Sequence, residues 1–186
     1  MEFLARGKRG DVYLTRYRGK TVVVKQKRHE STALGALENE AYWLKKVNTK
    51  SIGPKFIYFT HGKLMMEYIQ GEPLQEYIEK KQISRAFIKE ILLQCRILDQ
   101  MRVNKFEMHH PVKHILFRKG KISRQRVVMI DFERCRSTLQ PKNVTQFCQY
   151  LIKIGLGNHD TLIPLLQNYK KDYSLRSFRN ILNAFL

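Results

Sequence analysis

The sequence predicts an α+β fold in two lobes, a small antiparallel sheet with one helix first and a minimal, mostly helical lobe after it. Residues 4–25 alternate strand-like stretches with glycine turns and end in an apolar run that leads into Lys25. Most of the later chain instead repeats apolar residues at three- and four-residue steps, as amphipathic helices do. We expect one domain, with a first lobe over residues 1–66, a hinge over 67–71 and a second lobe over 72–186.

The charge balance is the most unusual bulk property of the chain. It holds 35 lysine and arginine residues against 16 aspartate and glutamate residues, which gives a formal net charge of +19. Such an excess is typical of proteins with an anionic partner, such as nucleic acid or a ribonucleoprotein particle. A basic, solvated surface without any such partner explains the same numbers, and composition does not separate the two interpretations.

Composition also excludes several classes of protein. A hydrophobic fraction of 43% in 186 residues is enough for a core, which argues against global disorder. The three cysteines show no CxxC spacing, so a disulfide scaffold is not expected. No run approaches the roughly 18 apolar residues of a membrane span, and the first residues lack an apolar signal core. We therefore expect a cytoplasmic protein that does not enter a membrane.

The glycine turn near the start of the chain is the first candidate site. Gly7 and Gly10 stand three positions apart, and Val12 follows them. Glycine allows backbone N–H groups to approach phosphate oxygens, because no Cβ is in the way. Lys25, at the end of the next apolar strand, is positioned to supply a point charge to the same phosphates.

The rest of the first lobe follows from periodicity and turn residues. Residues 32–47 repeat apolar side chains at helical steps, and this helix contains Glu40. Residues 55–60 and 63–68 predict two strands on either side of the turn pair His61-Gly62.

The second lobe is predicted to consist of helices with a short strand pair. Ser84 is an expected N-cap, and Asp131 directly follows the apolar strand at 127–130. A carboxylate just beyond a buried strand suits Mg²⁺, which binds one or two carboxylates together with phosphate oxygens. The predicted helices cover residues 74–80, 85–103, 143–154, 161–169 and 175–185.

Taken in order, these motifs resemble the protein-kinase family. Ala5-x-Gly7-x-x-Gly10-x-Val12 and Val22-Val23-Val24-Lys25 resemble the kinase elements G-x-G-x-x-G-x-V and V-A-I-K, with Ala5 in place of the first glycine. Asp131-Phe132-Glu133 resembles D-F-G, with Glu133 in place of its glycine. Together with Pro-x-Lys-His-Ile at 111–115 and Asn143-Val144-Thr145, they look like a group of small predicted archaeal serine/threonine kinases, relatives of the RIO and KEOPS-complex kinases. The resemblance covers residues 4–152.

The resemblance implies an ATP site between the lobes. In such a site Glu40 would pair with Lys25 and hold it over the phosphates, while Asp131 would hold Mg²⁺. Met66 would stand at the back of the adenine pocket, and Glu67 and Ile69 would offer backbone contacts to the base.

The catalytic loop departs from the family pattern H-R-D-x-x-x-x-N. Aligned on Ile115-Leu116, His109 takes the position of the catalytic base and His114 that of the metal-binding asparagine. Histidine accepts protons near neutral pH, and Glu107 is the nearest carboxylate that could serve instead. A transition-metal site and ordinary loop packing are the other interpretations of this histidine cluster.

The predicted function is that of a Mg-ATP-dependent phosphotransferase, an atypical serine/threonine protein kinase or an ATPase of that fold. The expected substrate is a protein hydroxyl group or water. The alternative is a catalytically degenerate, nucleotide-binding pseudokinase that docks RNA or a ribonucleoprotein through its basic surface. A small-molecule kinase is a third interpretation, disfavoured because little chain remains to build an acceptor pocket.

Overall fold

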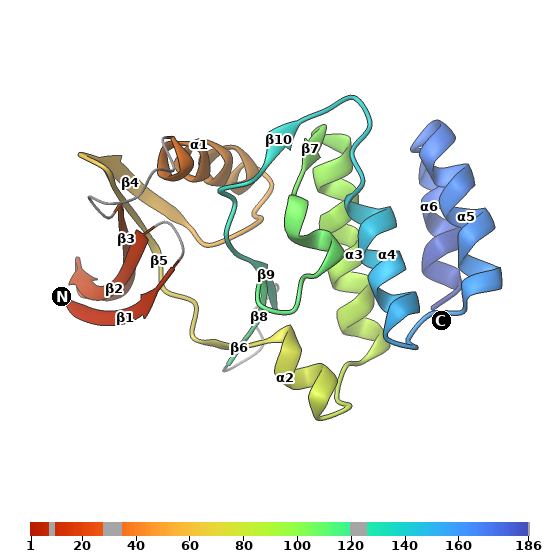
Figure 1. Ribbon diagram of the computed structural model, residues 1–186, viewed down its shortest axis with the longest axis horizontal. Helices are drawn as coiled ribbons and strands as arrows, with labels where there is room; N and C mark the ends of the chain where they lie inside the picture. The colour runs from red at the N-terminus through yellow and green to blue at the C-terminus, as the bar shows by residue number, and fades with distance from the viewer. Residues whose placement is uncertain (8–9, 28–34, 120–125, 186) are drawn as a thin grey trace. The chain divides into compact units, whose positions relative to one another are not determined.

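The computed structural model describes residues 1–7, 10–27, 35–119 and 126–185. By its contacts the chain forms two compact units, each drawn in Figure 1. The first combines Met1–Gly71 with Leu116–Cys135, and the second combines Glu72–Ile115 with Arg136–Leu186. The first residues of the helix predicted at 32–47 lie outside the described ranges.

The first unit is built on a five-stranded antiparallel sheet in the order β1-β2-β3-β5-β4. Two of its hairpins turn at the pairs Arg18-Gly19 and His61-Gly62, where all four residues have positive φ between 45° and 75°. This geometry is that of type I′ turns, whose twist matches the twist of the flanking strands. The strands are β1 (Glu2–Arg6), β2 (Gly10–Tyr17), β3 (Lys20–Lys27), β4 (Phe56–Thr60) and β5 (Lys63–Glu67).

Helix α1 (Ala36–Asn48) contacts strands β3, β4 and β5, so it lies against one face of this sheet. Its buried side chains include Ala41, Leu44 and Val47, three positions apart, as the helical period requires. The same unit contains β8 (Ile115–Arg118) and β9 (Val127–Met129), which form a second sheet with β6 (Gly71–Pro73) in the order β6-β8-β9.

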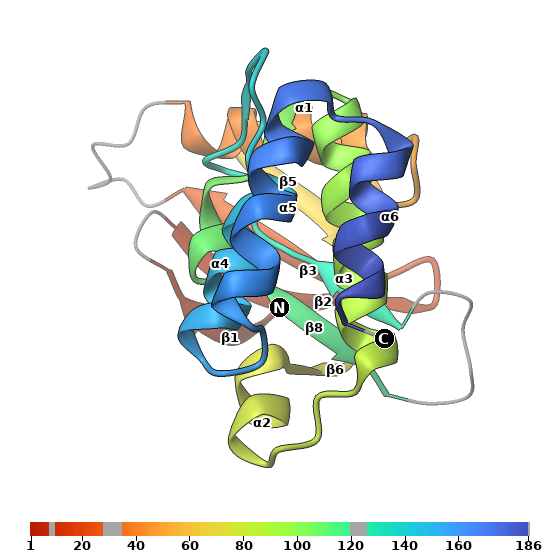
Figure 2. The same ribbon diagram turned by 90° about the vertical axis from the view of Figure 1, so that its right-hand side faces the viewer.

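The second unit consists mainly of helices, which Figure 2 shows from one side. Helix α3 (Arg85–Gln100) contacts α4 (Asn143–Lys153) and α6 (Leu175–Asn183), while α5 (His159–Asp172) contacts α4 and α6. The unit also holds α2 (Leu74–Glu79), the short pair β7 (Val103–Asn104) with β10 (Arg136–Ser137), and the 3₁₀ helix η1 (Phe106–His109).

The α+β class is confirmed, and each predicted helix is present with slightly different ends. Ser84 caps α3 as expected, since its Oγ accepts a hydrogen bond of 3.3 Å from the N–H of Phe87. Helix α5 is longer than the predicted 161–169 and runs through Pro164 in its first turns. No helix in the described ranges combines the length and apolar character needed to cross a membrane.

Candidate functional site

The site is centred on Lys25, whose direction follows from the strand period. Val24 and Lys25 are neighbours on β3, so their side chains leave opposite faces of the sheet. Lys25 points to the face covered by α1, where its Nζ lies 2.6 Å from Oε1 of Glu40. The side chain of Glu40 is only 2% exposed. The structure thus joins the strand lysine to the helix carboxylate that the sequence singled out.

Asp131 approaches the same ammonium from the segment that follows β9. Its Oδ1 lies 3.8 Å from Nζ of Lys25, and its side chain keeps 27% of its surface exposed. Its backbone has a positive φ of 65°, which is uncommon outside glycine and is found at functional sites. Lys25, Glu40 and Asp131 all belong to the first unit, and the structure brings them together.

The electrostatics of this trio keep Lys25 charged. Burial alone would lower the pKa of its ammonium, and this is the largest single influence on it. The nearby carboxylates of Glu40, Asp131 and Glu133 together outweigh the burial, so the pKa of Lys25 is raised above its usual value. The site therefore presents a permanent cation at neutral pH.

The segment after β9 is held beside α1 by Asn39, a residue that the sequence reasoning did not select. Its Nδ2 donates hydrogen bonds to the carbonyl oxygens of Glu133 at 2.8 Å and Cys135 at 3.1 Å. Asn39 immediately precedes Glu40 on α1, so one helical turn fixes both the partner of Lys25 and the segment that carries Asp131. An asparagine beside the pairing glutamate is a weak sequence signal, because its position does not show which carbonyl oxygens its side chain reaches.

The glycines of the β1–β2 turn have identifiable structural roles. A Cβ on Gly10 would lie 2.6 Å from the carbonyl oxygen of Gln26, so the close approach of β2 and β3 requires glycine there. The N–H of Gly7 donates to the carbonyl oxygen of Gly10 at 2.9 Å. Val12 lies opposite Lys25 in the register and so faces the same side of the sheet.

The predicted adenine-contacting residues lie at and after the end of β5. Met66 is 5% exposed and pairs with Val23, two residues from Lys25, so it shares the face of Lys25. The N–H of Glu67 donates to the carbonyl oxygen of Lys55 at 2.8 Å, so any contact from its backbone to a base has to use its carbonyl. Ile69 is buried, also at 5% exposure.

The two candidate catalytic bases lie in the second unit and differ in environment. Glu107 is buried, and its Oε2 pairs with Nζ of the fully buried Lys105 at 3.1 Å. His109 is exposed, and its Nδ1 lies 2.6 Å from the carbonyl oxygen of Phe106. A carbonyl only accepts hydrogen bonds, so Nδ1 carries the proton and Nε2 is the acceptor of the neutral ring.

His114 is half-buried in the second unit, and its N–H donates to the carbonyl oxygen of Pro111 at 2.8 Å. Within the described residues, no three or more His, Cys, Asp or Glu side chains gather in positions that suit a metal ion. Asp131 as a single carboxylate still fits Mg²⁺, because Mg²⁺ takes much of its coordination from phosphates and water.

A buried network at the start of α4 explains the Asn143 motif in the second unit. Asn143 Oδ1 accepts from the N–H of Lys105 at 2.8 Å, and its Nδ2 donates to Oδ1 of Asp99 at 2.7 Å. The hydroxyl of Tyr169 donates to Oδ2 of the same carboxylate at 3.0 Å. Burial raises the pKa of Asp99 to about 6, although these hydrogen bonds oppose the shift.

Comparisons with known proteins identify the fold. No protein-family model matches the chain, and no curated protein sequence matches it. Among solved structures, the chain is similar to the Rio2 kinase from Chaetomium thermophilum in a complex described as ADP/Mg²⁺-phosphoaspartate. The TM-score is 0.63 and the sequence identity is 14%, and the match covers 99% of this chain and 70% of the Rio2 chain. A second structure of that Rio2 kinase gives the same TM-score and identity and is covered to 72%. The chain therefore has a protein-kinase-like fold.

Proposed function

We propose that the protein is a Mg-ATP-dependent phosphotransferase, an atypical serine/threonine protein kinase. One observation carries this proposal: the ammonium of Lys25 lies 2.6 Å from Glu40 and 3.8 Å from Asp131. Phosphoryl transfer depends on positioning and charge neutralisation rather than on covalent chemistry by the protein. A partly buried strand lysine fixed by one carboxylate, with a second carboxylate alongside, provides both. The solved Rio2 complex with ADP and Mg²⁺ supports the same assignment by fold.

Each residue of the trio has a distinct role in the proposal. Lys25 pairs with phosphate oxygens of ATP, and Glu40 keeps its ammonium in place. Asp131, with 27% of its side chain exposed, holds Mg²⁺. Bound Mg²⁺ would neutralise negative charge on the phosphates. His114 is the weaker metal ligand, because Mg²⁺ prefers oxygen donors to imidazole.

The remaining predicted contacts to ATP come from the same face of the sheet. Val12 and Met66 share that face with Lys25 through the strand register, and we assign them to the adenine end of the nucleotide. Backbone atoms of Glu67 and Ile69 would hold the edge of the base. Backbone groups of Gly7 and Gly10 would approach the phosphates.

For the base that accepts the substrate hydroxyl proton, the local geometry favours His109 over Glu107. The carboxylate of Glu107 is buried against Lys105, so its charge is already used to stabilise the fold. His109 is exposed and, with Nδ1 bound to a carbonyl oxygen, keeps the lone pair of Nε2 as its acceptor. Imidazole is an effective general base near neutral pH.

Purified protein with ATP labelled at the γ-phosphate and Mg²⁺ tests the proposal. We expect label on the protein, on an added protein substrate or in free phosphate, and a loss of about 10³-fold in Asp131→Asn. Asp160→Asn is the matched control, because Asp160 is a fully exposed acid of the second unit. Absence of turnover, or equal turnover in both variants, would overturn the assignment.

A second candidate function, a nucleotide-binding module that docks single-stranded RNA, is favoured by the opposite face of the sheet. Phe3 pairs with Tyr13, which pairs with Val24, so their side chains share the face turned away from Lys25. Phe3 is 53% exposed. The guanidinium of Arg18 lies 5.3 Å from the ring centre of Tyr17, on the same hairpin. Exposed aromatics with flanking cations are the surface on which single-stranded bases stack.

Binding of a labelled single-stranded RNA at several salt concentrations tests this second candidate. Affinity should fall steeply with salt if several phosphates are contacted, and Phe3→Ala should weaken it about tenfold. Tyr42→Ala is the control, since Tyr42 is an aromatic residue of α1 with 58% exposure. No binding at low salt, or equal loss in both variants, would contradict the docking role.

A further inference from the structure

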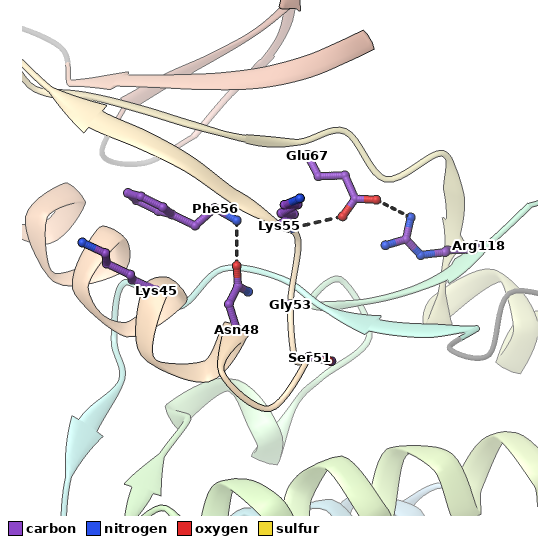
Figure 3. A pocket seen from close by; sticks show the side chains of 8 residues that line it. All are labelled: Lys45, Asn48, Ser51, Gly53, Lys55, Phe56, Glu67 and Arg118. Atoms are coloured by element: carbon purple, nitrogen blue, oxygen red, sulfur yellow. Dashed lines mark hydrogen bonds and ion pairs between the residues drawn. The ribbon is translucent and has the colours of Figure 1, made fainter. Parts of the chain in front are cut away.

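The first unit contains a pocket of about 480 Å³ that shares only Glu67, whose backbone is assigned to the base of ATP, with the phosphotransferase proposal. Neither Lys25 nor Glu40 nor Asp131 lines it. Its walls come from the last turns of α1, the link to β4, the end of β5 and the end of β8, as Figure 3 shows. The lining residues are Lys45, Asn48, Ser51, Gly53, Lys55, Phe56, Glu67 and Arg118.

One wall of the pocket is fixed by Asn48 at the end of α1. Its Nδ2 donates to the carbonyl oxygens of Ile52 at 2.8 Å and Pro54 at 3.0 Å, and its Oδ1 accepts from the N–H of Phe56 at 2.7 Å. Gly53 has φ of 81°, and a Cβ there would lie 2.8 Å from the ring of Phe132. The link between α1 and β4 is therefore held in one shape, and its lining groups are preorganised (Figure 3).

The carboxylate in the pocket is already occupied on both oxygens. Oε1 of Glu67 accepts from Nη1 of Arg118 at 2.8 Å, and Oε2 accepts from the N–H of Lys55 at 3.0 Å. Burial would raise the pKa of Glu67, but the hydrogen bonds from Arg118 and Lys55 outweigh it, and the pKa is lowered. Glu67 thus stays ionised and orients the guanidinium along the pocket wall.

The basic side chains exceed this single acid. Lys45, Lys55 and Arg118 contribute three positive charges and Glu67 one negative charge, so the lining has a net charge of +2. The ammonium of Lys45 lies 5.7 Å from the ring centre of Phe56, which keeps it over an apolar part of the wall. A hollow with such a balance attracts an anion.

We propose that this pocket binds a phosphate monoester group. Its dianion balances the charge of +2, whereas a carboxylate or a phosphodiester supplies a single negative charge and leaves one cation unmatched. An arginine oriented by a carboxylate, with lysines alongside, supplies the charge-assisted hydrogen bonds that phosphate oxygens accept. The volume lies within the range of small-molecule sites. The group comes either from a free phosphorylated compound or from a phosphorylated side chain.

The pocket lies between elements that also carry residues of the proposed ATP site. The pocket joins the end of α1, the helix of Glu40, to Arg118 on β8, whose N–H donates to the carbonyl oxygen of Arg126 at 2.9 Å just before β9. A bound phosphate would fasten together the elements that carry Glu40, Glu67 and Asp131. Binding itself depends only on the pocket residues and stands apart from any phosphotransferase activity.

The test is titration calorimetry of the full chain at pH 7.5 and constant ionic strength. The probes are inorganic phosphate, O-phosphoserine and, for comparison, serine and chloride. We expect both phosphate probes to bind and serine and chloride not to bind. Whichever phosphate probe binds more tightly identifies the source as a free compound or a modified side chain. Lys55→Gln should weaken binding about tenfold, and Arg118→Gln should weaken it further because it also releases Glu67.

Lys50→Gln is the matched control, because Lys50 is an exposed lysine of the same link that does not line the pocket. It should bind phosphate as the unaltered protein does. O-phosphoserine should also bind more weakly at pH 5 than at pH 7.5, since its second pKa is near 6. Equal binding by Lys55→Gln and the unaltered protein would overturn the proposal. So would loss of phosphate binding in Lys25→Met with no loss in Lys55→Gln, or binding of RNA without binding of either phosphate probe.

Discussion

Glu40 in the first unit and Asp99 in the second are buried carboxylates that are stabilised in different ways. In the first unit Glu40, 2% exposed, faces the ammonium of Lys25 at 2.6 Å. In the second unit Asp99, 4% exposed, is surrounded by neutral donors from Asn143, Val144 and Tyr169. One acid is balanced by charge, the other by hydrogen bonds alone.

The difference separates the proposed ligand site around Lys25 from a structural anchor around Asp99. Around Lys25 the attraction of three carboxylates overcomes burial and keeps a cation in place. Around Asp99 the hydrogen bonds from Asn143, Val144 and Tyr169 do not offset the burial, and the pKa rises to about 6. A charged group poised beside a partly exposed acid can engage phosphate and metal. The hydrogen bonds that Asp99 accepts join α3 to α4 and α5, which is a structural role.

The largest effect is expected from Asp99→Ala. The change leaves two donors of Asn143, the N–H of Val144 and the hydroxyl of Tyr169 without their acceptor. We expect the free energy of unfolding in urea to fall by about 3–5 kcal/mol. Asp160→Ala, at an acid with 97% side-chain exposure, should change it by less than about 0.5 kcal/mol. Similar losses in both variants would show that the network is not an anchor.

A smaller loss is expected from Lys25→Met, which leaves Glu40 buried without its cation. Lys25 itself is 22% exposed, so solvent reduces the penalty, and we expect about 2–3 kcal/mol in urea unfolding at pH 7. Adding Glu40→Gln should restore at least about 1 kcal/mol, because the unpaired charge is removed. If the two changes simply add, the pair is not coupled, and the contrast between the units is weaker than proposed.

The pH dependence of stability distinguishes the two acids directly. An unfolded aspartate ionises near 3.8, whereas Asp99 in the folded protein ionises near 6. Its contribution is therefore fully present below pH 3.8 and is lost as the pH rises through 6. Between pH 4 and pH 7, the unfolding free energy should fall by about 2 kcal/mol more in the unaltered protein than in Asp99→Asn.

This difference isolates Asp99, because other acids contribute equally to both proteins. Glu67 and Asp172 have lowered pKa values, so their contributions have the opposite sign and cancel in the comparison. Parallel pH profiles for the unaltered protein and the variant would mean that Asp99 does not titrate in this range.

The smallest loss of stability is expected at the N-terminal end of α3, opposite the end that carries Asp99. Ser84→Ala removes the hydroxyl that accepts from the N–H of Phe87, and should cost about 1 kcal/mol in thermal or urea unfolding. The helix is the one that carries Asp99, so the two variants compare a local cap with a tertiary network. If Ser84→Ala lowered the unfolding free energy as much as Asp99→Ala does, the stability of this unit would depend on α3 alone rather than on the tertiary network of Asp99.

The parts of the fold that could be predicted from the sequence are mostly those set by turn residues and helix caps, which act between near neighbours. The pairs Arg18-Gly19 and His61-Gly62 set two hairpins, and Ser84 sets the start of α3. The short strands β6, β7 and β10 were not predicted, because two or three residues carry no period. Their pairing is decided by partners distant in sequence, as for Arg136 with Asn104.

At the candidate site, the sequence pointed to Lys25, Glu40 and Asp131 through their order and neighbours, and the structure gathers them. The sequence did not point to Asn39 or to the proposed phosphate pocket. Each residue that lines the pocket is an ordinary side chain when it is considered alone. The roles of His109 and His114 remain proposals.

What the sequence determined by itself was the set of elements and the chemistry placed at their ends, because periodicity, turn residues and caps act between near neighbours. The tertiary structure alone decided which charges meet. The raised pKa of Lys25, the pKa of Asp99 near 6 and the net charge of +2 around Arg118 each arise from groups far apart in the chain. Burial and Coulomb attraction depend on distance in space, and only folding sets that distance.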